Sequence, residues 1–331
     1  MYRFALSRLG SLTVVLFSLS VLIFVLGRLG GGDPVRSYLG ANASPEAVAT
    51  ARERLGLDRA LVVQYWDYLS RILQGDFGLS ISTRRTVGSE LSSRLPATLE
   101  LAFWTVLFTI VLAVALARIC SLRGRFAGVI RFVLFSAASA PSFLVATAGL
   151  LIFFGSLHLL PVSGRTSYGP SEGLSGFYVL DGVLSGNLAY SLDALAHLVL
   201  PVVAAGLAPG VALARVLADG LDASAASGYA RTARALGETD SQILRRHALR
   251  NAASPALSML GVLFGAMLTS LVVVEGIFSW NGLGQYLVRA IGVADINSVA
   301  TISLILGAAC VVLNAFVDIG LAVLDPRIRL T

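Results

Sequence analysis

The stretch YARTARALGETDSQILRRHALRN, Tyr229–Asn251, contains five arginines and lies between two long apolar runs, Leu198–Leu217 and Ala256–Val274. The whole chain has 331 residues, of which 56% are hydrophobic and 13% are charged, and its mean hydropathy is +0.80. This composition lies outside the range of ordinary water-soluble domains. Each of the two runs is about as long as a helix that crosses a bilayer. The arginine-rich stretch is therefore predicted to connect two membrane-spanning helices.

The order of residues within this stretch predicts two short helices that meet at a glycine. The first helix covers Tyr229–Leu236 and is expected to end at Gly237, because glycine is the preferred residue just after a helix C-terminus. Thr239 or Asp240 can cap the second helix. Two short helices joined in this way form a compact knob, and a knob that is continuous with a membrane helix can transmit force to a soluble partner.

Six apolar runs are long enough to cross a membrane, because a bilayer core about 30 Å thick requires roughly 20 apolar helical residues. We therefore predict an all-α polytopic membrane protein with six transmembrane helices over Leu9–Leu29, Ala97–Ala117, Phe132–Phe154, Leu198–Leu217, Ala256–Val274 and Val299–Val323. The first run follows two arginines, as in a signal peptide, but it is longer than a typical signal-peptide core and no A-x-A site follows directly after it. We interpret it as a retained span. Kinks are expected at Pro141, Pro201 and Pro209.

The arginines predict the orientation of the bundle, because short cytoplasmic loops are enriched in basic residues. Four arginines follow the second run and five follow the fourth, whereas the third and fifth runs are followed only by Arg165 and Arg289. The segment between the first two runs also contains arginines, but it exceeds the roughly 60 residues over which this rule applies. Both termini are consequently predicted to be cytoplasmic.

Several kinds of chemistry are excluded or disfavoured by residue type. All 25 residues counted as lysine or arginine are arginine, so the chain can contain neither a phosphate-binding loop of the form G-x-x-x-x-G-K-[ST] nor a Schiff-base lysine. Cys120 and Cys310 show no metal or redox spacing, and the three histidines lie far apart in the sequence. The spans contain neither G-x-S-x-G nor H-E-x-x-H, which disfavours an intramembrane hydrolase.

The long segment after the first span is predicted to contain two helices. One begins with Ser44 as N-cap and ends at Gly56. The other covers Leu61–Gln74 and stops at Gly75. The second helix has an apolar face that comprises Val62, Trp66, Leu69 and Leu73. That face is interpreted either as a docking surface for an extracytoplasmic partner or as a surface that packs on the protein's own spans or on lipid.

The arginine-rich stretch resembles the EAA loop of ABC-importer permeases, in which E-A-A is followed by three residues, a glycine, nine residues and I-x-L-P. Ala233, Gly237 and Leu249 fit this general pattern. The positions that depart from it are Arg231, Thr232, His247 and Arg250. The stretch is closer to the variant of the dipeptide/oligopeptide branch, which resembles Y-x-R-T-A-R-A-x-G…RHALRNA and is matched from Tyr229 to Ala252.

Further motifs extend the resemblance over nearly the whole chain and are similar to those of that branch's first permease subunit. They are GDPV at 32–35, LGLD at 55–58, QY at 64–65, GDFGLS at 75–80, RLPATLEL at 94–101, LPVSGR at 160–165, HLVLP at 197–201, VVVEGIFSWNGLG at 272–284 and LDPRIR at 324–329. One departure is Asn281, where the family commonly has proline. Another is the glycine- and serine-rich stretch Ser167–Asn187, which resembles a loop insertion.

The resemblance implies the type I ABC-importer permease fold and a multi-pass protein of the bacterial cytoplasmic membrane. It divides the chain into residues 1–29 with the first span, an extracytoplasmic helical segment at 30–96, and a five-helix core at 97–331 with a coupling loop at 220–252. The coupling residues that it implies are Tyr229, Arg231, Thr232, Ala233, Arg234, Ala235, Leu236, Gly237, Arg246 and His247. For the arginines alone, orientation and contact with lipid headgroups remain an alternative role.

The implied partners are two ATPase subunits, a second homologous permease, an extracytoplasmic solute-binding protein and membrane lipid, with no nucleic acid. The chain itself is expected to be non-catalytic and to hold no cofactor, with ATP and Mg²⁺ bound by the ATPase subunits. The cargo implied is a dipeptide or oligopeptide, and glutathione and nickel chelates are carried by similar permeases.

Three polar residues are candidates for a translocation path or gate. Asn314 and Asp318 lie four residues apart on one face of the last span, and intramembrane carboxylates often line pathways. A structural ion pair of Asp318 with a loop arginine is an equal alternative. Glu275 lies in the VVVEGIF motif, where it can shape an outer gate, hold the following FSWNGLG turn, or simply end a helix.

The main alternative function is an ion-coupled secondary transporter or a channel. Such proteins commonly have paired ionisable residues near the membrane midplane or interrupted helices at matching positions of two repeats. The spans offer only Asp318 and no clear repeat. These observations favour the ATP-driven permease.

Overall fold

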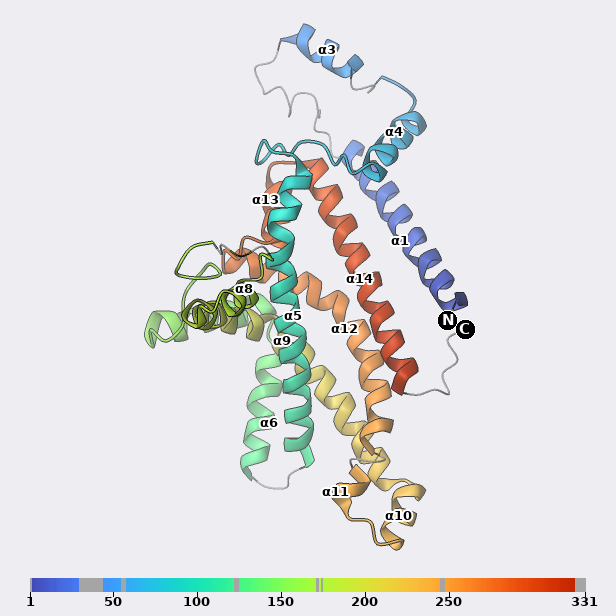
Figure 1. The fold of residues 1–331 in the computed structure, drawn as a ribbon, viewed down its shortest axis with the longest axis vertical. Coiled ribbons are helices and arrows are strands. Elements are labelled where there is room, and N and C mark those ends of the chain that lie inside the picture. The colour runs from blue at the N-terminus through green and yellow to red at the C-terminus, as the bar shows by residue number, and fades with distance from the viewer. Residues whose placement is uncertain are drawn as a thin grey trace.

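The chain folds into a bundle of long helices that carries short helices at both of its ends (Figure 1). A computed structural model describes residues 2–29, 44–54, 58–121, 125–170, 173, 175–244 and 248–324. Within these ranges the regular structure is helical, apart from one antiparallel bridge between Leu79 and Thr86. The all-α fold class predicted from the apolar runs is confirmed.

Five helices are long and apolar enough to cross a membrane. They are α1 (Tyr2–Leu29), α5 (Val87–Ser121), α9 (Leu188–Ala226), α12 (Leu249–Ile277) and α14 (Ile296–Leu324). Each contains one of the predicted spans and extends beyond it, because polar turns continue the helix outside the apolar run. Pro201 and Pro209 lie inside α9, which remains one helix.

The third predicted span is a bent pair of helices rather than a single helix. α6 (Arg125–Ala138) is followed by α7 (Ser142–Gly149) and the π-helix η1 (Leu150–Ser156), and the two parts are bent by 111°. Pro141 stands at the break with an extended backbone, φ −58° and ψ 148°. A proline cannot donate an N–H to the preceding turn and disfavours helical conformation in the residue before it. If the pair is counted as one span, the structure has six.

α9 is the central helix of the bundle and packs along both α5 and α12. Two glycines allow the close approach of α5. A Cβ atom at Gly206 would lie 2.8 Å from the Phe108 ring, and one at Gly210 would lie 2.8 Å from the Leu112 side chain. Buried apolar residues of α5, α9, α12 and α14 form the main core, which includes Leu116, Ala214, Leu260, Met267 and Val317.

Five of the short helices lie at two opposite ends of the bundle. α3 (Pro45–Arg54), α4 (Leu61–Leu73) and α13 (Leu283–Gly292) lie at one end, whereas α10 (Gly228–Ala235) and α11 (Asp240–Ile243) lie at the other (Figure 1). α8 (Tyr178–Leu184) packs beside α9. α1 packs against α14.

The predicted boundaries of α3 and α4 agree with the local hydrogen bonds. Ser44 Oγ accepts from the backbone N–H of Ala47 at 3.2 Å and so caps α3, while the predicted stop at Gly56 lies outside the described residues. Gly75, at φ +79°, ends α4, and the N–H of Asp76 donates to the Arg71 carbonyl at 2.9 Å. This is the hydrogen bond of a glycine-terminated helix.

Candidate functional site

The arginine-rich stretch forms a knob of two short helices, α10 and α11, which we call the coupling knob (228–243). Gly237 has φ +88°, a backbone conformation that is energetically unfavourable for residues with a Cβ atom. Its N–H donates to the Arg234 carbonyl at 3.0 Å, and the next N–H, of Glu238, donates to the Ala233 carbonyl at 3.1 Å. These two bonds define a Schellman motif. The helix end predicted at Gly237 is confirmed.

Thr239 caps the second helix of the knob in a reciprocal arrangement. Its Oγ1 accepts from the Gln242 N–H at 3.3 Å, and its own N–H donates to Gln242 Oε1 at 2.8 Å. This capping box satisfies two backbone donors that α11 itself cannot pair. Of the two caps that the sequence offered, Thr239 is the one used. α11 covers Asp240–Ile243, α12 begins at Leu249, and residues 245–247 between them lie outside the described ranges.

The knob has its own small core and is attached to both neighbouring spans. Ala230, Ala233 and Ile243 form a buried apolar cluster. Asn251 of α12 donates from Nδ2 to the Tyr229 hydroxyl at 3.0 Å, and Arg234 Nη1 donates to the Ala225 carbonyl of α9 at 3.3 Å. The knob is therefore fixed by hydrogen bonds to both α9 and α12.

The outer face of the knob is exposed and mixes basic and apolar side chains. Its members among the predicted coupling residues are Tyr229, Arg231, Thr232, Arg234, Ala235, Leu236 and Gly237. Leu236 is 81% exposed at the turn. Ala233 instead belongs to the buried cluster. Arg246 and His247 lie outside the described residues.

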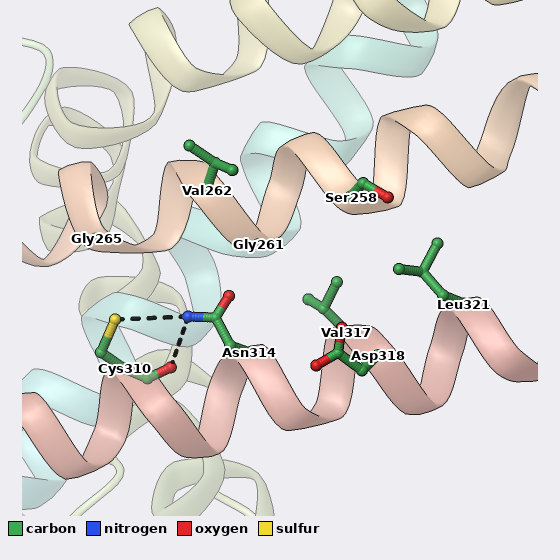
Figure 2. A pocket seen from close by; sticks show the side chains of 9 residues that line it. All are labelled: Ser258, Gly261, Val262, Gly265, Cys310, Asn314, Val317, Asp318 and Leu321. Carbon is green, nitrogen blue, oxygen red and sulfur yellow. Dashed lines mark hydrogen bonds between the residues drawn. The ribbon is translucent and has the colours of Figure 1, made fainter. Parts of the chain in front are cut away.

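A groove of about 390 Å³ lies between α12 and α14, within the spans. Figure 2 shows Asn314 of α14 pointing toward Gly261 of α12. A Cβ atom at Gly261 would lie 2.9 Å from Asn314 Oδ1, so the glycine makes room for the amide. Asn314 Nδ2 donates to the Cys310 carbonyl at 3.0 Å. The lining residues are Ser258, Gly261, Val262, Gly265, Cys310, Asn314, Val317, Asp318 and Leu321.

Asn314 and Asp318 thus share one groove, whereas Glu275 lies elsewhere. Glu275 is fully buried near the end of α12. Its carboxylate accepts from the Thr98 hydroxyl at 2.6 Å and from the backbone N–H groups of Gly284 and Gln285 at 2.7 and 3.1 Å. The last two groups belong to the first turn of α13, where a carboxylate is favoured. Glu275 therefore holds the FSWNGLG turn against α5.

Asn281 occupies a backbone conformation in this turn that proline cannot adopt. Its φ is +57°, and its N–H donates to Gln285 Oε1 at 3.1 Å. Its side chain also accepts a hydrogen bond from Arg94 Nη1 at 2.5 Å. Proline has a fixed negative φ and no N–H. The departure from the family pattern at this position is consistent with the turn that this chain forms.

Two polar clusters were missed by the sequence interpretation. Arg165 Nη2 contacts Glu100 Oε2 at 2.6 Å, and its guanidinium lies 3.6 Å from the centroid of the Tyr178 ring. This ion pair fixes the loop that precedes α8 to α5.

The second missed cluster is centred on Asp295, which is fully buried and caps α14. Its Oδ2 accepts from Ser80 Oγ at 2.6 Å and from Ser298 Oγ at 2.8 Å. The pairs Glu100–Arg165 and Ser80–Asp295 are distant in sequence, so no local pattern indicates them.

The helical bundle, with five helices long and apolar enough to cross a membrane, defines a polytopic membrane protein. The sequence profile described as "Binding-protein-dependent transport system inner membrane component" matches residues 96–330, and the profile of the corresponding N-terminal region matches residues 1–102. The chain belongs to this family. It is therefore a permease subunit with the type I ABC permease fold, located in the inner membrane of bacteria.

Relatives with similar sequences are permeases of peptide transport systems. The chain is 34% identical over 325 residues to a probable D,D-dipeptide transport system permease of Escherichia coli K12, covering 97% of this chain and 96% of the relative. It is 35% identical over 333 residues to a di/tripeptide permease of Pseudomonas aeruginosa, and 32% identical over 334 residues to a glutathione permease of Salmonella choleraesuis. Both alignments cover 99% of each chain.

Proposed function

We propose that this chain is the translocating subunit of an ATP-driven importer of dipeptides, oligopeptides or related small solutes. The observation that carries the proposal is the coupling knob, a structured projection fixed to two spans and faced with exposed arginines and Leu236. A surface of this kind suits a groove on a soluble partner, because arginine forms planar ion pairs and a buried leucine contributes about 1.5–3 kcal/mol. The relatives that transport peptides and glutathione support the class of cargo.

The proposed assembly contains two ATPase subunits, a second homologous permease and an extracytoplasmic binding protein. ATP and Mg²⁺ would be bound by the ATPase subunits, since the lysine of a phosphate-binding loop is lacking in this chain. The knob and both termini are placed on the cytoplasmic side, and the segment at 30–96 on the opposite side, ahead of the core at 97–331. Closure of the ATPases would move the knobs and tilt the attached spans between inward-open and outward-open states.

The groove between α12 and α14 is proposed to border the translocation path. Asn314 and Asp318 offer polar groups there, and the neighbouring α12 surface includes the small residues Ser258, Gly261 and Gly265 beside Val262. Small residues allow another helix or a substrate to approach closely. Glu275 is proposed to act indirectly, by holding the turn before α13 at the end of the path.

The proposal is tested by purifying the tagged chain from its native cell in mild detergent and identifying co-purifying proteins by mass spectrometry. We expect a second permease, ATPases and a binding protein. Leu236→Asp is expected to reduce recovery of the ATPases by about tenfold or more, because a buried apolar contact would become a buried charge. Leu184→Asp is the matched control, since Leu184 is 74% exposed on α8.

Two results would contradict the proposal. One is a stable homo-oligomer without ATPases under conditions that preserve a known ABC complex. The other is full ATPase recovery with Leu236→Asp, which would show that the exposed knob surface does not bind them.

A further inference from the structure

α4 packs one face against the membrane-spanning helix α1. The Tyr65 hydroxyl lies 2.8 Å from Ser20 Oγ, and the Tyr65 ring packs edge-on against Phe24 and Phe17 with centroid distances of 5.4 and 6.1 Å. Ser20 is 3% exposed, so this contact is closely packed. α4 is therefore held on α1 by an aromatic cluster.

The contact lies inside the apolar part of α1, not beyond its end. The apolar window of α1 extends from Gly10 to Gly27. Ser20 precedes Gly27 by seven residues, which at 1.5 Å per residue corresponds to about 10 Å along the helix. Helices that lie in a membrane interface typically insert about 5–10 Å below the headgroup boundary. Tyr65 of α4 thus contacts α1 within its apolar window, as expected for a helix at that depth.

A second face of α4 is apolar and uncovered. Val62, Trp66 and Leu73 are 68%, 58% and 79% exposed, and their spacing places them on one side of the helix. The opposite side is polar and includes Asp67, which forms an exposed ion pair with Arg59 at 3.6 Å, and Arg71. α4 thus has a packed face, an apolar exposed face and a polar face.

We propose that α4 lies in the membrane interface, with Val62, Trp66 and Leu73 among the lipid acyl chains. The uncovered face continues the exposed apolar surface of α1, where Phe17, Leu22 and Leu26 are 50%, 53% and 56% exposed. Tryptophan is enriched at this depth, because its ring is apolar and its N–H is polar. The segment between the first two spans is thereby anchored to the bilayer as well as to α1.

The proposal is tested by placing single cysteines at positions 62 and 71 in a Cys120→Ser, Cys310→Ser background. These positions are nine residues apart (71 − 62) and so lie on opposite faces of the helix. Each is labelled with an environment-sensitive fluorophore in the assembled transporter, reconstituted in nanodiscs whose lipids carry nitroxide on the acyl chain. We expect nitroxide quenching of Val62→Cys to exceed that of Arg71→Cys several-fold, with the emission of the former shifted to the blue.

Two results would overturn the proposal that α4 lies in the membrane interface. Equal quenching of both labels by aqueous iodide, without nitroxide quenching, would mean that α4 stands clear of the bilayer. Shielding of position 62 from both quenchers only when the second permease or the binding protein is present would mean that a protein covers this face.

A label-free measurement guards against disturbance by the fluorophore. Quenching of tryptophan emission by brominated lipid is compared between the native chain and Trp66→Phe, and we expect the difference to be large. An absent difference contradicts the proposal. Neither experiment depends on the coupling knob, so a negative result here leaves the proposed import function intact.

Discussion

Gly237 shows how one residue can determine the shape of a functional surface. A Cβ atom there would meet nothing within 4 Å, so the requirement for glycine comes from the backbone, at φ +88°. Gly237→Val is expected to cost roughly 1–2 kcal/mol in the native turn, because L-residues disfavour this conformation. We expect it to reduce transport without blocking insertion, as measured by uptake and membrane abundance.

Two other variants distinguish the effect of the backbone conformation at Gly237 from the effect of an added side chain. Gly237→Asn should retain more transport than Gly237→Val, because asparagine tolerates positive φ. Gly228→Ala should behave as the native chain, since Gly228 also has no atom within 4 Å of a Cβ position and lies in a helix. Normal uptake by a correctly inserted Gly237→Val protein would show that the turn is not required for coupling.

Glu275 is predicted to be a residue of structural importance. Glu275→Ala would leave the Thr98 hydroxyl and two backbone N–H groups of α13 without their acceptor. We expect the free energy of unfolding to fall by roughly 3 kcal/mol, because each buried unpaired donor costs about 1–3 kcal/mol. Thermal unfolding in detergent measures the change. The exposed Glu53→Ala is the control, and an unfolding temperature equal to that of the native chain would refute this role.

At the scale of the element, close packing of α5 on α9 depends on glycine. A side chain at Gly206 would meet Phe108, Thr109 and the Thr105 carbonyl, all within 3.3 Å. Gly206→Leu is therefore expected to lower stability by about 1–3 kcal/mol, the usual cost of overpacking. The measurement is the yield of monodisperse protein in size-exclusion chromatography.

The control for Gly206→Leu is a leucine placed at a helical glycine that has no close neighbours. Gly128 of α6 has no neighbour within 4 Å of a Cβ position, so Gly128→Leu should leave the yield unchanged. Equal losses for both variants would indicate a general effect of added leucine rather than helix packing.

The elements were predicted from sequence to very different degrees. Apolar length is a local property, so the runs identified the spans, while Gly237 identified the end of α10 and Thr239 was one of two predicted caps for α11. The 111° bend at Pro141 was expected only as a kink, because its size depends on how α7 packs against α9.

The site was predicted less completely than the elements. Glu100 and Arg165 are 65 residues apart, and Ser80 and Asp295 are 215 apart, so no local pattern connects them.

At the scale of the whole molecule, the orientation predicted from the arginines can be tested directly. The structure places the knob and the α4–α13 region at opposite ends (Figure 1). A periplasmic reporter enzyme fused after Gly169 should be active, and the same reporter fused after Gly237 should be inactive. Fluorescence of green fluorescent protein fused to the C-terminus should show that this end is cytoplasmic. The reverse pattern would invert the proposed topology.

The position of Asp295 late in the chain determines when its hydrogen bond with Ser80 can form during synthesis. During synthesis at about 5–20 residues per second, the acceptor for Ser80 is made roughly 10–40 s after Ser80 itself. Until then the hairpin at 76–86 lacks the carboxylate on which it docks. This contact consequently forms late, after every long helix except α14 has been translated. A chain truncated before Asp295 would therefore carry four of the five long helices but would lack the carboxylate that accepts from Ser80.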